Sequence, residues 1–309
     1  MNRFRTVLCA AAFGALALSL PANAQEASSS SNPETTEADE DSIVVTGDRE
    51  RPTRREVNRQ ARDISAITSG LRGKPLARIE DRLCPGIIGL RTSGAELMID
   101  RIRWNAERLE MPLADDTGCT PNLIVAFVDD GKALINSMAR EQGHLFASLT
   151  LPERRALLAE DGPVRVWTTT ADKTRDGMPI PRRESLHNPP VVSMWMAHSK
   201  IYLTIRQDIE QVVVLFDREG VRGKSLVQLA DYVTMRSFAR TKPAGGDAAL
   251  DTILALFDAQ HEPPPGLTDF DQAYLRSVYE GIPNLPASSK LLGVNRELNR
   301  LIEREESAE

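Results

Sequence analysis

The segment 223–239 constrains the fold most, because its sequence predicts a helix with almost no polar surface. Apolar side chains recur at the i, i+3, i+4 and i+7 spacing of one helical face, and others fill most of the remaining circumference. Ser225, followed three residues later by Gln228, predicts a capping box at the amino end. We therefore expect a buried helix around which the domain packs. Its apolar residues are Leu226, Val227, Leu229, Ala230, Tyr232, Val233, Met235 and Phe238.

One carboxylate, that of Asp231, lies within this apolar helix. Moving a charge out of water is costly unless the charge is paired or hydrogen-bonded. Asp231 could form an ion pair with an arginine, either Arg236 or one from another element, or it could be a buried acid with a raised pKa. We favour a structural ion pair.

The same helix resembles the active-site helix of matrixin-type zinc peptidases. That helix reads His-Glu-x-x-His-x-x-Gly-x-x-His, and its histidines hold zinc while the glutamate activates water. The three histidine positions fall here on Val227, Asp231 and Ser237, and the glutamate position falls on Gln228. Valine cannot bind a metal, and a glutamine cannot accept a proton. The resemblance implies a zincin-like domain that has lost its metal site, so no catalytic, metal-binding or cofactor-binding residue is carried over.

Two downstream segments extend this resemblance over about residues 90–280. Residues 251–257 are similar to the part of the family that carries the Met-turn. Residues 267–279 are similar to its closing helix, which reads Leu-Thr-x-x-Asp-x-x-x-Leu-x-x-Leu-Tyr. The whole chain resembles a family of exported proteobacterial proteins more than any working protease.

The amino terminus predicts a secretory signal peptide over residues 1–24. Arg3 and Arg5 precede an apolar run, 7–20, that is too short to span a bilayer with polar flanks, and Ala22-Asn-Ala24 is a small-x-small cleavage pattern. We therefore expect a periplasmic product. Losing two arginines and no acid lowers the formal net charge from −6 to −8, which argues against nonspecific nucleic-acid binding.

The cysteines agree with export. Cys9 lies in the signal, which leaves Cys84 and Cys119 as an even pair in an oxidising compartment. We predict a disulfide between them, closing a loop of about 36 residues. Two cysteines this far apart, without a Cys-x-x-Cys motif, do not indicate a zinc site.

Residues 25–75 are expected to form a disordered tether. Residues 25–41 contain six acids and no base, and residues 49–62 contain six arginines and two glutamates. The basic run predicts a solvated helix or coil, with contact to anionic lipid or an acidic partner as the alternative. Between the two lies an apolar, β-branched strand, 42–47, with the sequence Ile43-Val44-Val45-Thr46-Gly47.

This strand resembles the TonB box of outer-membrane receptors. The resemblance implies that it binds TonB, or another envelope protein, by adding a strand to an exposed sheet edge. The alternative is a short strand that pairs with the chain's own sheet. Nothing else in the chain resembles those receptors, which need a large barrel of alternating strands.

Residues 76–309 predict one globular domain of the α/β (α+β) class, with a mixed sheet packed by helices. The span 172–190, rich in proline, predicts a mobile insertion. A Gln207-Asp208 turn between two apolar runs predicts a hairpin. The expected helices are 92–109, 132–141, 152–160, 248–258, 268–279 and 288–304, and the expected strands are 121–128, 164–170, 201–205 and 212–216.

The histidines offer no recognisable chemistry. His144, His187, His198 and His261 have no partner at the i, i+3 or i, i+4 spacing of a metal site. The chain has no Gly-x-Ser-x-Gly elbow, phosphate loop or dinucleotide motif. Asp129-Asp130-Gly131 is a turn at the end of a strand that could hold a cation. We therefore expect a non-catalytic envelope protein that binds other proteins. The alternative is a periplasmic hydrolase with Asp231, Gln228 or His261 in a cleft.

Overall fold

The computed structural model describes residues 51–67, 70–115, 118–180, 187, 198–199, 201–245, 248–260 and 262–307. The expected signal peptide, the acidic leader and the TonB-box-like strand lie outside these residues. The chain divides into two units, Met1–Arg49 and Glu50–Glu309, and the second contains all of the described structure.

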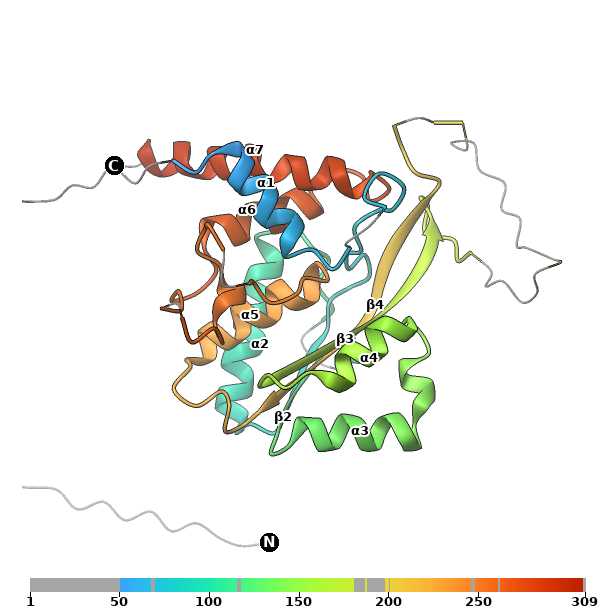
Figure 1. Ribbon diagram of the computed structural model, residues 1–309, viewed down its shortest axis with the longest axis vertical. Coiled ribbons are helices and arrows are strands. Elements are labelled where there is room, and N and C mark those ends of the chain that lie inside the picture. The colour runs from blue at the N-terminus through green and yellow to red at the C-terminus, as the bar shows by residue number, and fades with distance from the viewer. Residues whose placement is uncertain are drawn as a thin grey trace, which may run out of the picture. The chain divides into compact units, whose positions relative to one another are not determined.

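A four-stranded mixed sheet forms the centre of this unit (Figure 1). Its strands follow the order β1-β2-β4-β3, in which β1, β2 and β4 are parallel and the edge strand β3 is antiparallel to β4. The expected mixed α/β class is confirmed. The strands are β1 (Pro85–Ile88), β2 (Leu123–Val128), β3 (Val164–Thr174) and β4 (Ile205–Asp217).

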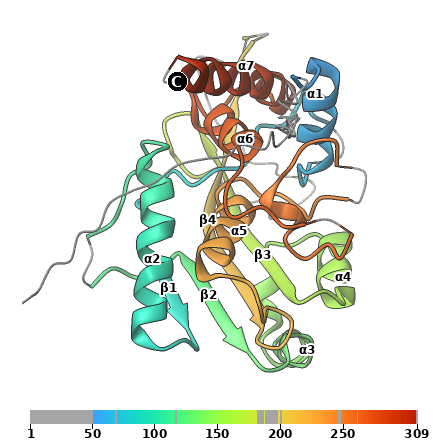
Figure 2. The same cartoon turned by 90° about the vertical axis from the view of Figure 1, so that its left-hand side faces the viewer.

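Helices cover both faces of the sheet because the strands alternate their side chains between two apolar clusters (Figure 2). Val214 and Phe216 of β4 point into the main core, whereas Val213 and Leu215 point into the smaller one. The main core contains α2 (Thr92–Glu107) and α5 (Leu226–Phe238), and the smaller one contains α3 (Gly131–Glu141) and α4 (Leu151–Ala159).

Three more helices complete the main core. Thr268 caps α6 in a capping box with Asp271, as the threonine at this position predicts. The helix α1 lies against α7, and its Val57 and Ala61 are fully buried. These helices are α1 (Arg54–Asp63), α6 (Asp269–Tyr279) and α7 (Ala287–Glu306).

The expected boundary at residue 76 is wrong, because α1 belongs to the globular unit. Thr53 and Glu56 form its capping box, and its inner face is apolar although its outer face is strongly basic. The isolated bridges Ser65–Thr241 and Pro75–Pro286 join the following segment to the rest of the unit. A composition dominated by arginine concealed an amphipathic helix.

The expected hairpin within residues 201–216 is also wrong. Gln207 and Asp208 continue the strand β4, which pairs with β3 along its whole length. Asp208 lies within a buried stretch of strand because Arg206 and Lys173 neutralise its carboxylate. The strand β3 reaches Thr174, inside the span expected to be an insertion, and the expected helix 248–258 is only a 3₁₀ turn, Ile253–Ala255.

The disulfide between Cys84 and Cys119 is confirmed, with the two Cα atoms 6.2 Å apart. It joins the residue before β1 to the loop that enters β2. Next to it, Leu83 exchanges backbone hydrogen bonds with Pro112 and Ala114, so the same loop is also held by main-chain contacts. Among the described helices, none combines the length and the apolar character needed to span a bilayer.

Candidate functional site

Asp231 is the centre of a buried polar cluster in which both carboxylate oxygens are occupied. Arg101 of α2 binds the carboxylate in a bidentate pair, with Nε 2.8 Å from Oδ1 and Nη2 2.7 Å from Oδ2. The Asn105 amide donates to Oδ1 at 2.7 Å, and the backbone N–H of Leu267 donates to Oδ2 at 2.9 Å. The expected structural ion pair is confirmed, and its partner comes from another element.

Arg236, the sequence-local candidate for this pair, points elsewhere. Its guanidinium donates to the Thr241 carbonyl at 3.1 Å and to the Tyr232 hydroxyl at 2.6 Å. The chain also comes close to Asp231 at Gly266, where a Cβ atom would lie 2.6 Å from Oδ2. Glycine is therefore required there, because it lets the loop before α6 deliver the Leu267 N–H to the carboxylate.

The other positions that resemble the zinc-peptidase helix are also committed to internal contacts. Gln228 exchanges hydrogen bonds with Ser225 as the cap of α5, and its amide nitrogen donates to the Pro264 carbonyl at 2.8 Å. The Ser237 hydroxyl donates to the Val233 carbonyl one turn earlier. Val227 is half-buried. Gln228 and Ser237 therefore use their polar groups to cap α5, to bind the preceding turn and to hold the loop at Pro264.

The histidines are scattered across the described part of the chain. His144 is exposed in a 3₁₀ turn after α3, His187 and His198 are exposed in the connection between β3 and β4, and His261 lies outside the described residues. Where side chains are described, no group of three histidine, cysteine, aspartate or glutamate residues is placed to hold a metal ion.

The Asp129-Asp130 turn takes part in helix capping and ion pairing. The Asp130 side chain accepts from the Ala133 N–H at 2.8 Å and caps α3. Asp129 is exposed and lies 3.3 Å from Arg218. The N–H of Gly131, the first residue of α3, donates to the Asp217 carboxylate at the end of β4. This hydrogen bond joins the carboxyl ends of β2 and β4.

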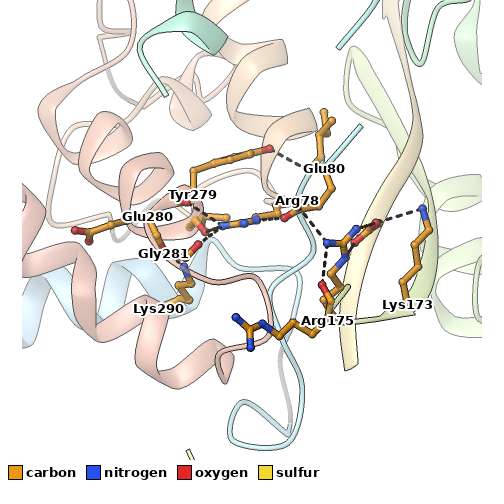
Figure 3. A network of polar contacts seen from close by, with 12 residues as sticks. Arg78, Glu80, Lys173, Arg175, Tyr279, Glu280, Gly281 and Lys290 are labelled. Atoms are coloured by element: carbon orange, nitrogen blue, oxygen red, sulfur yellow. Dashed lines mark hydrogen bonds and ion pairs between the residues drawn. The ribbon is translucent and has the colours of Figure 1, made fainter. Parts of the chain in front are cut away.

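A second ionic network, not predicted from the sequence, lies where residues 78–80 cross between β4 and α6 (Figure 3). Arg78 donates to three carbonyls at the end of α6, those of Val278, Tyr279 and Gly281, at 2.9–3.2 Å. It also pairs with Glu80. Glu80 lies 3.6 Å from Arg206 of β4, which continues the network to Asp208 and Lys173.

Lys290 completes the capping of α6. Its ammonium group donates to the Glu280 carbonyl, and burial together with the nearby charge of Arg78 lowers the pKa of Lys290 to about 8. Cations near the carboxyl end of a helix satisfy free carbonyls and oppose the negative end of the helix dipole. The network therefore holds five segments together, which are β3, β4, residues 78–80, the end of α6 and α7, and it caps α6.

Asp271 is a third fully buried acid. It accepts from the Thr252 hydroxyl at 2.6 Å and from the N–H groups of Ile253 and Thr268 at 2.8 and 3.1 Å. Burial raises the pKa of Asp271 to about 6, although these hydrogen bonds oppose the rise. The carboxyl group joins the segment before α6 to its first turn.

The stability of the fold should depend on the ionisation of Asp271. Its pKa in the folded state, about 6, is above the value of 3.8 for a free aspartate, so the fold binds this proton more tightly than the unfolded chain does. This stabilisation is complete below pH 3.8 and is lost as the pH rises through about 6. Between pH 4 and 8 the wild type should lose about 3 kcal/mol of unfolding free energy relative to Asp271→Asn.

Urea unfolding of both proteins over this pH range measures the difference. Asp269→Asn, which removes a carboxylate from the same helical turn, is the matched control and should follow the wild type. Parallel curves for the wild type and Asp271→Asn would show that the buried carboxyl does not bind this proton.

Comparison of the chain with protein-family models, with curated proteins and with solved structures gave no match. The function therefore has to be argued from the residues themselves.

Proposed function

We propose that this chain is a non-catalytic exported protein that works in the cell envelope by binding another protein. The observation that carries the proposal is the cluster around Asp231. Arg101, Asn105 and the N–H of Leu267 occupy both oxygens of its carboxylate. The position that holds a zinc-binding histidine in a matrixin-type peptidase is therefore filled by a side chain that is committed to internal contacts. The signal-like sequence of residues 1–24 supports export to the periplasm.

The hydrolase alternative has less support. A general base must reach a substrate proton, directly or through one water. Asp231 is fully buried and fully hydrogen-bonded, and Gln228 caps its own helix. His261 lies outside the described residues.

The proposed binding element is the strand 42–47. Its β-branched residues suit an extended peptide that adds to the sheet of TonB or another envelope protein, where main-chain hydrogen bonds supply the affinity. The acidic residues before it and the arginines after it favour an exposed position for this segment.

Val45→Pro should weaken binding to the periplasmic domain of TonB by about tenfold or more, because proline removes a donor from the added strand. Val45→Thr is the matched control, since threonine keeps the N–H and the β-branched shape. Titration of the labelled mature chain with the TonB domain measures both. Equal affinity for the two variants, or no complex with the wild type, would reject strand addition to TonB.

A further inference from the structure

The helix α1 is held rigidly by its inner face. Val57 and Ala61 are fully buried, and Gln60 exchanges two hydrogen bonds with the backbone of Leu250, at 2.7 and 2.8 Å. Thr53 and Glu56 cap its amino end. In both views α1 lies beside α7 (Figures 1 and 2), so its outer face has a defined orientation on the globular unit.

The outer face of α1 is a row of exposed guanidinium groups. Arg54, Arg55, Arg59 and Arg62 are all exposed, and none forms an ion pair with a carboxylate in the described part of the chain. Arg55, Arg59 and Arg62 follow the i, i+4, i+7 spacing of one helical line, which we call the arginine stripe. Like charges at this spacing destabilise a helix. The Glu56 carboxylate offsets part of this cost, since hydrogen bonds from Thr53 and the nearby charge of Arg59 lower the pKa of Glu56.

The neighbouring surface of α7 extends this face. Leu292 of α7 is 42% exposed and lines a shallow hollow together with Arg54. Arg296 and Arg300 border the same hollow, and both are paired with Glu280 and Glu297. The face thus combines arginines without ion pairs on α1 with an exposed apolar side chain and compensated charges on α7, and the carboxylate of Glu303 lines the same hollow.

We propose that this face, the arginine stripe with the adjoining surface of α7, docks on an anionic lipid bilayer. Guanidinium groups match phosphate with two parallel hydrogen bonds, and a basic helix surface is attracted to anionic headgroups. The apolar side of α1 is already buried in the core, so the helix lies on the headgroups and does not insert between the lipids. The whole chain carries a formal charge of −6, so attraction to the membrane must be local to this face.

A lipid surface fits this face better than a nucleic acid or an acidic peptide. Single-stranded nucleic acids are bound with the help of aromatic stacking platforms, and α1 has no aromatic residue. An extended peptide needs a groove or a sheet edge. Only Arg59 of the stripe borders the hollow between α1 and residues 242–245 and 248–249, whereas Arg55 and Arg62 lie outside it.

Sedimentation of the full chain with phosphatidylcholine vesicles, with and without phosphatidylglycerol, tests the proposal. We expect binding only to the anionic vesicles, and loss of this binding at high salt. The triple variant Arg55→Gln, Arg59→Gln, Arg62→Gln should bind about a hundredfold more weakly, since each charge contributes roughly a fivefold effect near a membrane. Glutamine keeps the helix propensity of arginine, so α1 should remain folded.

The matched control removes three exposed arginines from other helices and their caps, Arg91→Gln, Arg140→Gln and Arg155→Gln, with the same change in net charge. It should bind like the wild type.

Equal loss of vesicle binding in both triple variants, or no binding of the wild type, would overturn the proposal. Binding of the wild type to poly-glutamate but not to anionic vesicles would also overturn it, in favour of an acidic protein partner. Thermal unfolding of the triple variant of the arginine stripe should show undiminished stability, because the substitutions remove the repulsion between neighbouring positive charges.

Discussion

Asp231→Ala should lower the free energy of unfolding by about 3–5 kcal/mol, the largest effect that we expect from a single substitution in this protein. The variant removes the acceptor for four hydrogen bonds, which come from Arg101, Asn105 and Leu267. The variant also leaves the guanidinium group of Arg101 without its negatively charged partner, although this side chain is only 27% exposed. Urea unfolding followed by far-UV circular dichroism measures the loss.

Asp129→Ala is the matched control for this experiment. Asp129 also pairs with an arginine, Arg218, but it lies in solvent, where ion pairs contribute about 0–1 kcal/mol. The double variant Arg101→Met, Asp231→Leu should recover part of the loss, because it leaves no unpaired charge behind. If Asp231→Ala costs no more than Asp129→Ala, the cluster does not have the structural role argued above.

Removal of the disulfide should have the next largest effect. The double variant Cys84→Ala, Cys119→Ala should lose about 3–4 kcal/mol of unfolding free energy, the chain-entropy value for a loop of about 36 residues. The backbone hydrogen bonds of Leu83 to the same loop favour a folded variant with lowered stability.

Thermal unfolding with and without dithiothreitol supplies the comparison. The reductant should lower the melting temperature of the wild type to that of the double variant, and it should leave the variant itself unchanged. A melting temperature that is the same for the oxidised wild type and the variant would mean that the cross-link does not constrain the unfolded chain.

The helices α5 and α6 could be predicted well because their signals are local. The periodic apolar residues and the Ser225–Gln228 cap of α5 are sufficient to locate that helix within one or two residues, and Thr268 does the same for α6. The strand β2 was equally clear as an uninterrupted apolar run. In these segments the local preference agrees with the fold.

The run 212–216 was predicted as a strand, but the full extent of β4 could not be predicted, because the polar residues before that run follow a tertiary requirement. Gln207 and Asp208 suggest a turn, yet Asp208 remains in the strand because Lys173 of β3 and Arg206 neutralise it. For α1, the basic run predicted a solvated helix or coil, and what was missed is that one face of this helix is buried. Four exposed arginines dominate its composition, while only Val57, Gln60 and Ala61 contact the core.

The sequence by itself determined that a carboxylate sits inside an apolar helix and needs a partner, because that conclusion depends only on helical periodicity and on the cost of burying a charge. It also predicted the disulfide between Cys84 and Cys119. Only the tertiary structure decided that Arg101, 130 residues away, is the partner of Asp231, and that residues 78–80 cap the end of α6. Such contacts depend on how distant segments are brought together, and the spacing of residues along the chain does not indicate this.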